Sequence, residues 1–324
     1  MKNEINFKPT DKKLLAHLYH NSRENASKIA KQLHLSREQV SYRINKFESQ
    51  KIIKGYIPLV NYSRLGYHLT TLIFFKFNKQ NSIAKFKEKI KESKNRIITV
   101  EILSRYDLGA LFVFKNEKER NEYLSEILNQ NSSEISKYQI IEPYFSEFYP
   151  LKFLNNKQSQ PLIFQEYKLD EYKLDEKERK ILSVLNKNAN ARIIDISKAT
   201  NISAELVVYK LKKLKKEKVL ITSKAYFDME KVGYFYSIVL INFNNLSKAN
   251  QNKMREFAKS SLYVDSLMFM MGEPNCYIQI FHKNVSDIHN TLKNLKETFS
   301  DDSLIFDILP LKNEGESINS IPFL

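Results

Sequence analysis

The sequence has a single cysteine, no tryptophan and no long apolar run, and each absence narrows what the protein can be. With only Cys276 among 324 residues, an internal disulfide framework is excluded and a reducing compartment is favoured. Residues 1–6 lack the apolar core of a signal peptide. Apolar runs such as Leu72 to Phe75 are the size of a strand, well below the roughly 18 residues of a membrane-spanning helix. We therefore expect a cytoplasmic protein that does not insert into a membrane.

Motifs that would carry catalysis or bind a metal are also missing from the sequence. No phosphate-binding loop and no Ser/His/Asp arrangement is visible. His17 and His20 share a predicted helix face, but no cysteine or nearby set of carboxylates accompanies them. We expect no enzyme activity, no metal and no cofactor.

Positive charge is abundant and unevenly distributed. The chain carries a formal net charge of +15, and its 42% hydrophobic content is sufficient for packed cores. Residues 1–62 carry about +7 and residues 171–228 about +6, while the rest of the chain is nearly neutral. An AT-rich genome would spread lysine over the whole sequence, whereas clustered charge indicates a polyanionic partner. Nucleic acid is the polyanion that this pattern favours.

The sequence repeats itself after about 167 positions. Leu65-Gly66-Tyr67 returns as Val232-Gly233-Tyr234, and Phe114-Lys115-Asn116 returns as His282-Lys283-Asn284. This period is too long for a solenoid unit and matches the length of a small two-domain protein. The chain therefore resembles two fused subunits that form an intrachain pseudo-dimer.

Residues 1–62 predict three helices followed by a β-ribbon wing. Apolar spacing gives helices over Asp11 to Tyr19 and Ala26 to Leu33. Ser36 with Gln39 forms a capping box that begins a third helix, which runs to about Gln50. The alternation from Ile52 to Ile57 predicts the wing. Three helices with a tight turn before the last form a helix-turn-helix, whose third helix enters the major groove of DNA.

The outward face of this third helix carries side chains that suit base recognition. Arginine bonds guanine bidentately, and asparagine or glutamine bonds adenine. The candidate DNA-binding residues of this block are Arg37, Gln39, Ser41, Tyr42, Arg43, Asn45, Lys46 and Lys54.

Residues 171–228 predict a second helix-turn-helix with a different exposed face. Its third helix, capped by Ser203, carries lysine where the first block has Asn45 and Lys46. Lysine is a point charge that suits phosphate better than a planar base edge. The candidate residues here are Tyr209, Lys210, Lys212, Lys213 and Lys216. We expect the first block to read sequence and the second mainly to hold the DNA backbone. An alternative is that Leu206 and Val208 contact thymine methyls or pack against a neighbouring domain.

Residues 63–150 and 229–312 each predict the order strand, helix, strand, strand, helix, strand. In the first block the strands are Leu69 to Phe77, Arg96 to Leu103, Ala110 to Phe114 and Ile140 to Phe148. This is the split βαβ, ferredoxin-like pattern, in which helices cover one face of the sheet. The other face, with Leu72, Phe74, Leu111 and Val113 as candidates, must be covered by something, and the sister domain is the obvious cover.

The predicted fold class is α+β, with two winged helix-turn-helix domains alternating with two ferredoxin-like βαββαβ domains. The predicted boundaries are 1–62, 63–150, 171–228 and 229–312 for the four domains, 151–170 for a linker and 313–324 for a tail.

The helix-turn-helix residues and the Leu65-Gly66 step carry a family likeness. The elements Ile29-Ala30-Lys31-Gln32-Leu33, Leu35-Ser36, Arg43-Ile44 and Ile52-Ile53-Lys54-Gly55-Tyr56 resemble the Lrp/AsnC (feast/famine) transcriptional regulators. The resemblance covers nearly the whole chain twice, and the second copy departs from it at Lys210 and Thr222. It implies a regulator that binds double-stranded DNA and responds to a small-molecule effector such as an amino acid, with further homo-oligomers possible.

The same resemblance implies candidate effector-binding residues in the ferredoxin-like domains. They are Tyr106, Asp107 and Leu108 in the first copy, and Gly272 and Asn275 in the second. The sequence departs from the family signature at both places, with Ser104 instead of glycine in the first copy and Pro274-Asn275 instead of Tyr-Asp in the second.

Two other functions stay open. The siroheme-decarboxylase group resembles Lrp/AsnC proteins and uses histidine and arginine near the central strands, but residues 102–111 and 269–278 contain no histidine. The chain could instead be a sensor or co-regulator that acts through protein partners without binding DNA.

Overall fold

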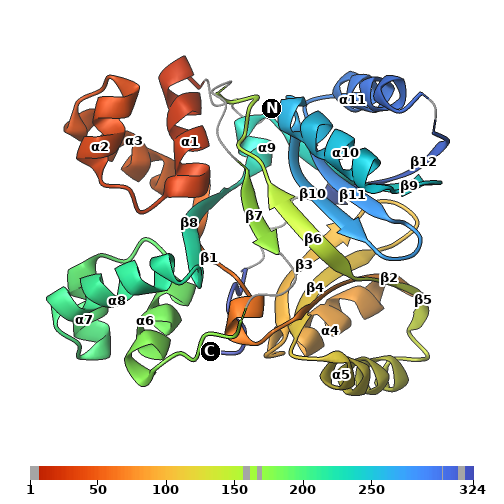
Figure 1. Cartoon of the computed structure of the whole chain (residues 1–324), viewed down its shortest axis with the longest axis horizontal. Coiled ribbons are helices and arrows are strands. Elements are labelled where there is room, and N and C mark those ends of the chain that lie inside the picture. The colour runs from red at the N-terminus through yellow and green to blue at the C-terminus, as the bar shows by residue number, and fades with distance from the viewer. Residues whose placement is uncertain (1–6, 156–160, 166–169, 301, 313–317) are drawn as a thin grey trace.

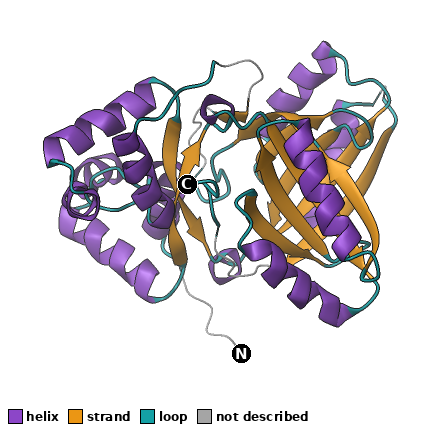
Figure 2. Ribbon diagram, turned by 90° about the horizontal axis from the view of Figure 1, so that it is seen from below, coloured by secondary structure: helices purple, strands orange, loops and turns teal. Residues whose placement is uncertain are grey.

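The computed structural model describes residues 7–155, 161–165, 170–300, 302–312 and 318–324. Three helices of each repeat lie on one side of the molecule, and the sheets with their covering helices lie on the other (Figure 1). An antiparallel pair of strands runs between these two parts (Figure 2). Among the described residues, no helix combines the length and apolar character needed to cross a membrane.

The first headpiece consists of helices α1 (Pro9–Asn21), α2 (Ala26–Leu33) and α3 (Arg37–Ser49). The predicted capping box is confirmed: Ser36 Oγ accepts from the Gln39 amide at 3.1 Å, and Gln39 Oε1 accepts from the Ser36 amide at 3.0 Å. His34 adopts the left-handed conformation with φ 55°, which makes the turn between α2 and α3 tight.

The second headpiece repeats this arrangement with α6 (Glu176–Lys187), α7 (Ile193–Thr200) and α8 (Ala204–Lys216). Ser203 caps α8 as predicted, and Asn201 takes the left-handed position that His34 takes in the first headpiece. The same local geometry therefore arises from two different sequences.

The predicted wing exists as a strand in each repeat, but each strand pairs with its counterpart and not with its own neighbour. β1 (Ile53–Val60) and β8 (Leu220–Phe227) form a two-stranded antiparallel ribbon in which Ile57 lies opposite Lys224. Gly55 permits this close approach, because a Cβ atom there would lie 2.6 Å from Cε1 of Tyr226. The ribbon consequently joins the two repeats near their pseudo-twofold axis.

The two sheet domains have the predicted element order. The first contains β2 (Leu69–Phe77), α4 (Gln80–Lys91), β3 (Arg96–Ile102), β4 (Leu108–Phe114), α5 (Glu117–Gln130) and β5 (Ile135–Ile141). The second contains β9 (Phe235–Phe243), α10 (Lys248–Ser260), β10 (Val264–Met270), β11 (Cys276–His282), α11 (Val285–Thr298) and β12 (Leu304–Lys312). Their strand orders, β5-β2-β4-β3 and β12-β9-β11-β10, are the same when each is numbered within its own repeat. The short helix α9 (Met229–Val232) and the turn η1 (Ser63–Leu65) precede them.

The prediction of one continuous strand from Ile140 to Phe148 at the end of the first sheet domain is wrong. This segment divides at Glu142 into the end of β5, which pairs with β2, and β6 (Pro143–Phe148), which pairs with β10 of the second repeat. The end of β12 makes the matching connection, because Leu311 and Lys312 pair with β3. All these strands therefore belong to one sheet of ten strands, completed by β7 (Leu162–Gln165).

The prediction that the sister domain covers the open sheet face is confirmed. Leu72 and Phe74 of the first repeat share a buried cluster with Ile238, Leu240 and other residues of the second. The opposite faces are filled by the covering helices in two separate clusters. Val113 is an exception, because it packs in the cluster of the second headpiece.

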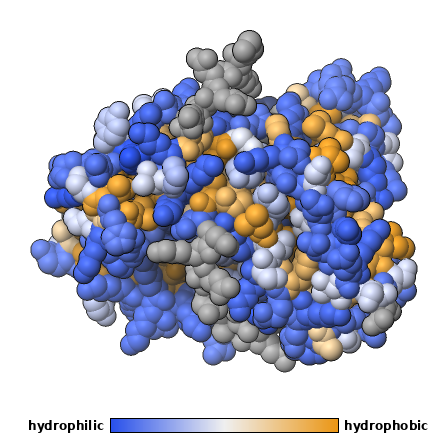
Figure 3. Space-filling model, turned by 90° about the horizontal axis from the view of Figure 1, so that it is seen from above, coloured by the Kyte–Doolittle hydropathy of each residue, from blue (hydrophilic) through white to orange (hydrophobic). Residues whose placement is uncertain are grey.

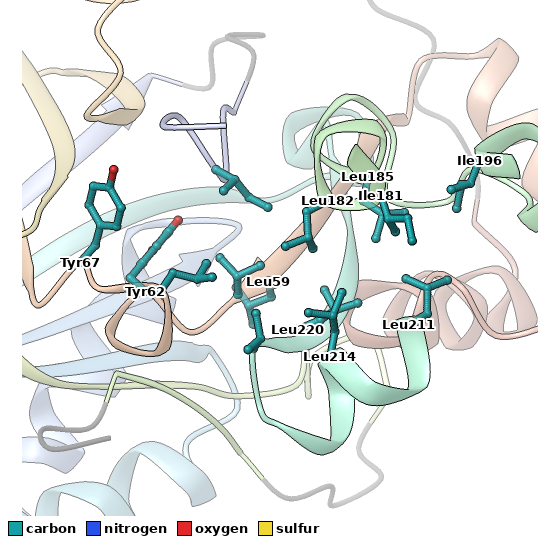
Figure 4. Packing of buried hydrophobic residues seen from close by; sticks show 14 of the residues in the cluster. Leu59, Tyr62, Tyr67, Ile181, Leu182, Leu185, Ile196, Leu211, Leu214 and Leu220 are labelled. Atoms are coloured by element: carbon teal, nitrogen blue, oxygen red, sulfur yellow. The ribbon is translucent and has the colours of Figure 1, made fainter. Parts of the chain in front are cut away.

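Each headpiece packs against the sheet domain of the other repeat. The second headpiece shares its core with Ile97 and Val113 of the first sheet domain. Leu59, Tyr62 and Tyr67, which lead into that domain, belong to the same core (Figure 4). The first headpiece shares its core with Phe227 of β8 and Phe281 of β11. Because of this crossed packing, each repeat buries apolar surface against the other. One repeat by itself would leave that apolar surface exposed to water.

Parts of the predicted linker and tail belong to these cores, which corrects their assignment. Phe153 packs on Tyr234 with ring centroids 4.2 Å apart, and Phe323 stacks on Tyr67 at 3.7 Å. Leu151 and Ile321 are fully buried. The strand β7 lies inside the predicted linker and pairs with β6. Residues 156–160 and 166–169 of the linker and residues 313–317 of the tail lie outside the described residues.

We expect the substitution Ile321→Ala to lower the free energy of unfolding by about 2–4 kcal/mol, because it leaves a cavity between the second headpiece and the first sheet domain. Urea denaturation followed by circular dichroism measures this change. Met271→Ala, at an 80% exposed position, is the control and should change stability by less than about 0.5 kcal/mol. An equal effect of both substitutions would contradict the packed C-terminal segment.

Candidate nucleic-acid interface

The outward face of α3 presents most of the predicted DNA-binding residues of the first repeat. Arg37, Asn45 and Lys46 are exposed, and Tyr42 has 69% of its surface exposed. Gln39 is exposed as well, but its side-chain oxygen is occupied by the capping box, which leaves its amide nitrogen to donate. Ser41 is half-buried. This face offers donors at the N-terminal end and along the middle of the helix.

Arg43 does not lie on that face. Its guanidinium forms an ion pair with Asp11 of α1, and both side chains are largely buried. Lys54 is also drawn inward, at 3.9 Å from Asp228. These two residues hold the first headpiece and the ribbon in place, because their charges are shared with carboxylates of the protein.

The outward face of α8 is more apolar and more uniformly basic. Tyr209 is 60% exposed, Val208 is exposed, and Lys212 and Lys216 are exposed cations. Leu206 packs on the core of the second headpiece, as one of the sequence-based alternatives allowed. Exposed lysines without planar donors suit phosphate contacts.

Lys210 and Lys213 turn toward the body of the second headpiece. Lys210 bonds Asp175 and lies 3.2 Å from Oε1 of Glu178, which is 1% exposed. Lys213 lies 3.5 Å from the same oxygen, and its Nζ is 5.4 Å from the centre of the Tyr172 ring. Hydrogen bonding to Tyr172 and the nearby Glu178 carboxylate raise the pKa of Lys213. Lys210, whose side chain is 11% exposed, is therefore committed inside the domain like Arg43, whereas Lys213 lies beside Glu178 with 38% of its side chain exposed.

The partners of these cations could have been found in the sequence. Asp11 and Glu178 occupy equivalent places of the repeat, as do Arg43 and Lys210. An acid and a base that are duplicated together indicate an internal pair. Arg43 and Lys210 were predicted to contact DNA from their positive charge alone, and the acidic residues that pair with them were not taken into account.

Each headpiece is also bonded to the ribbon strand of the other repeat. The Ser22 amide donates to the Ser223 carbonyl, and the Ala189 amide donates to the Tyr56 carbonyl, both at 3.0 Å. These bonds are equivalent in the two repeats. Arg23 adds an unequal contact, because its Nη1 donates to the carbonyls of Ala189 and Ala191 at 2.7 Å each. Arg23 was not among the residues predicted from the sequence, and its equivalent in the second repeat is Asn190.

The predicted effector-binding residues lie in two separate hairpins and are largely engaged in internal contacts. Asp107 accepts from the Phe77 amide at 2.9 Å and from Lys76 at 2.7 Å. Asn275 bonds both backbone groups of Phe243 in the equivalent place. These two side chains thereby fix the end of the first strand of each sheet domain.

The remaining effector candidates divide between core and surface. The buried Tyr106 donates its hydroxyl to Gln139 at 2.6 Å, and Leu108 is fully buried. Gly272 is exposed with φ 83°. A surface groove of about 500 Å³ lies elsewhere, between α11 and β12, and includes none of these residues. In the described part of the chain, no three His, Cys, Asp or Glu side chains form a group that could hold a metal ion.

Two exposed third helices, held by one ribbon on one side of the molecule, define a tandem helix-turn-helix protein. Hydrophilic residues cover most of the face seen in Figure 3, including the outer surface of the headpieces at its left. Residues 9–48 match the model of the AsnC-type helix-turn-helix domain, and residues 174–221 match that of a winged helix-turn-helix DNA-binding domain.

Curated relatives are about the length of one repeat. An HTH-type transcriptional regulator of Pyrococcus abyssi is 25% identical over 142 residues, which is 44% of this chain and 96% of the relative. One from Pyrococcus furiosus is 27% identical over 124 residues, which is 38% of this chain and 83% of the relative. The chain is a tandem protein with an AsnC-type helix-turn-helix domain in its first repeat and a winged helix-turn-helix domain in its second.

Solved structures extend the likeness of the fold to the whole chain. The siroheme decarboxylase NirDL, solved with an iron-uroporphyrin III analogue, aligns with a TM-score of 0.63 over 98% of this chain and 96% of its own, at 15% identity. The structure of Escherichia coli AsnC aligns over 43% of this chain at 19% identity, with a TM-score of 0.38. At these identities the comparison concerns the fold alone.

We expect Glu178→Ala to lower the free energy of unfolding by about 1–3 kcal/mol, because it removes the carboxylate that Lys210, Lys213 and the Tyr172 hydroxyl share. Urea denaturation measures the loss. Glu176→Ala removes an exposed partner of Lys180 on the same helix and should change stability by less than about 0.5 kcal/mol. An unchanged stability of the Glu178 variant would mean that the two lysines are free to contact DNA.

Proposed function

We propose that the protein regulates transcription by binding duplex DNA with both headpieces on one face of the double helix. The observation that carries this proposal is the pair of exposed third helices, related by the repeat and joined through the β1–β8 ribbon. The matches to two helix-turn-helix models and to helix-turn-helix regulators support it. The positive charge of residues 1–62 and 171–228 supplies a sequence-independent attraction to phosphate.

The proposed DNA contacts differ between the two headpieces. On α3, Arg37, Gln39, Tyr42 and Asn45 are the proposed base-reading residues, with Lys46 and Ser41 beside them. On α8, Lys212 and Lys216 are proposed to hold phosphates, with Tyr209 at the groove. A homodimer must read a palindrome, but unlike headpieces in one chain can read an asymmetric site. The two contacts are proposed to lie about one helical turn, roughly 34 Å, or a small multiple apart.

Selection of bound fragments from random duplex DNA, at stated salt, tests the proposal and its asymmetry together. We expect a motif with a well-defined half and a weakly defined half. A palindromic motif would argue against the division between the headpieces. Salt-insensitive or absent binding would favour a sensor that acts through protein partners.

Two matched double variants distinguish base recognition by α3 from phosphate contacts by α8. Gln39→Ala with Asn45→Ala should relax base preference, by about 1–3 kcal/mol for each side chain that no longer bonds a base. Lys212→Ala with Lys216→Ala should weaken binding to all sequences alike and reduce the slope of log affinity against log salt by about two. Fluorescence anisotropy at several salt concentrations measures both. Lys118→Ala, remote on α5, is the control, and an equal loss of preference in both double variants would contradict the division.

Small-molecule modulation is part of the proposal, with Tyr106, Asp107, Leu108, Gly272 and Asn275 as the proposed surroundings of an effector such as an amino acid. Their internal hydrogen bonds mean that an effector would have to bind beside them or displace those bonds. Thermal denaturation in the presence of each amino acid tests for binding, because a ligand of the folded state raises the melting temperature.

A second candidate function is decarboxylation of a tetrapyrrole, favoured by the whole-chain fold match to NirDL. Mixing the purified protein with an iron tetrapyrrole and recording the absorption spectrum tests it. If the regulator proposal holds, we expect no shift of the Soret band on titration. A saturable shift followed by loss of carbon dioxide would establish the enzyme instead.

A further inference from the structure

The contact between the first headpiece and the second sheet domain contains charged groups in an otherwise apolar core. Tyr19 of α1 donates its hydroxyl to Oδ2 of Asp265 on β10 at 2.7 Å, and Asp265 is 2% exposed. Lys224 of β8 lies above the Tyr19 ring, with its Nζ 3.8 Å from the ring centre, and 4.9 Å from the centre of the Phe148 ring. Three elements from different parts of the chain therefore meet at Asp265.

Other polar groups surround this carboxylate. Lys152 donates to the carbonyl of Val264, beside Asp265, and to those of Ala258 and Lys259. The titratable side chains that face the cluster are Tyr19 and His20 from α1, Lys152 from the segment after β6, Lys224 from β8, Tyr236 from β9, Asp265 from β10 and Tyr277 from β11.

The equivalent contact in the other half of the molecule is apolar at the same positions. The register of the hairpins places Ile97 where Asp265 lies, since each is the irregular residue of its strand. Backbone bonds agree: Tyr149 donates to the Asp265 carbonyl, and Asn319 donates to that of Ile97. Lys224 corresponds to Ile57, its partner across the ribbon.

The mirror positions of Ser266, Gln279 and Tyr19 also carry no charge. Ser266 and Gln279 beside Asp265 are matched by Ile98 and Leu111. Tyr19 is matched by Asn186, which bonds the neutral side chain of Asn319 and the backbone of Ile321. Two contacts of the same fold are therefore built from different chemistry.

We propose that Asp265 is a positioning residue for the first headpiece: through its hydrogen bond with Tyr19 it fixes α1 on the second sheet domain, beside Lys224 of the ribbon. At the mirror positions the second headpiece packs through apolar side chains and neutral hydrogen bonds, and its ion pair with the first repeat is made by other residues, Arg64 and Glu217 at 3.4 Å. The headpiece that we propose to read bases is thus the one whose contact with the other repeat contains a buried, hydrogen-bonded carboxyl group. Its position can respond to a change at the second sheet domain without moving the headpiece that holds phosphates. The DNA consequence rests on the proposed function, but the positioning itself does not.

Charge at this contact makes its strength depend on pH. Burial raises the pKa of Asp265 to about 6 and lowers that of Lys224 to about 8. Release of the headpiece into water returns both groups to their usual values near 4 and 10, so the docked state prefers the uncharged forms. The contribution of Asp265 and Lys224 to docking therefore weakens as pH rises from about 4 to 6, strengthens again as pH rises from about 8 to 10, and is smallest between, where both groups are charged. His20 acts in the opposite direction at low pH, because burial lowers its pKa from 6.5 to about 3.

Distance measurements between spin labels test the positioning without DNA. Labels at Lys31→Cys on α2 and Glu256→Cys on α10 report the first headpiece on the second sheet domain. Labels at Lys198→Cys on α7 and Glu88→Cys on α4 report the mirror contact. All four positions are exposed, and the buried Cys276 does not compete for the label. Double electron-electron resonance should give one narrow distance for each pair.

Substitution at Asp265 should affect one pair only. Asp265→Ala removes the acceptor of the Tyr19 hydroxyl and the carboxylate whose charge acts on Lys224, and should broaden or shift the first distance while the second stays unchanged. Asp265→Asn keeps an acceptor for the Tyr19 hydroxyl and should restore the narrow distance. Equal broadening of both pairs, or none in either, would overturn the proposal. A purely structural role would show as loss of folding in both variants alike.

A swap variant, Asp265→Ile with Lys224→Ile, copies the mirror residues Ile97 and Ile57 and tests the charge dependence. The unfolding midpoint of the wild type minus that of the swap variant should be lowest between pH 6 and 8 and rise on both sides. If the difference between the two midpoints does not vary with pH, the proposed charge dependence of this contact is wrong.

DNA binding of the Asp265→Ala variant then separates the two levels of inference. Loss of base preference with an unchanged salt slope supports positioning of the reading headpiece. An altered first distance without any duplex binding in the wild type leaves the positioning intact and rejects the proposed function. An unaltered distance with normal DNA binding rejects the positioning and leaves the proposed function intact.

Discussion

The sharing of strands between the repeats is the constraint on which the rest of the structure depends. A four-stranded sheet with helices on one face leaves its other face and its edges open, and water cannot be kept from either by one repeat alone. Here the last strand of each repeat continues past its own sheet and pairs with the second strand of the other, through β6 with β10 and β12 with β3. The open faces then meet in one buried cluster. Because this assembly occurs within one chain, it does not depend on protein concentration.

Crossed packing extends the same dependence to the headpieces. Each headpiece covers apolar residues of the other repeat, and among the described residues β1 pairs with β8 and with no strand of its own repeat. Both third helices are consequently presented from one framework. Fusion also removes the requirement that the two halves be identical, so that Asn45 of α3 is matched by Lys212 of α8, and Asp265 at one contact is matched by Ile97 at its mirror. Duplication with later divergence accounts for a symmetric backbone that carries unsymmetric chemistry.

The local structure could be predicted from the sequence because the signals for it are local. The capping box at Ser36, the apolar spacing of the helices and the strand pattern from Leu69 to Phe77 specify elements that the structure contains. Prediction failed where pairing depends on distant residues. The predicted wing is a strand with its partner in the other repeat, and the predicted strand from Ile140 to Phe148 serves two neighbours. The site residues show the same limit, since Arg43 and Lys210 pair with carboxylates outside their own helices.

The amino-acid sequence by itself determined that there are two repeats, what elements each contains and where the positive charge is concentrated, because periodicity, capping and composition act over a few residues. Only the tertiary structure decided which strands pair across the repeats, which cations remain exposed and which carboxylates are buried. Those outcomes depend on the exclusion of water from surfaces that touch in the fold but are formed by residues far apart in the sequence. Asp265 illustrates the difference: in the sequence it is one acid among 37 acidic residues, and in the fold it joins a helix, a ribbon and a sheet.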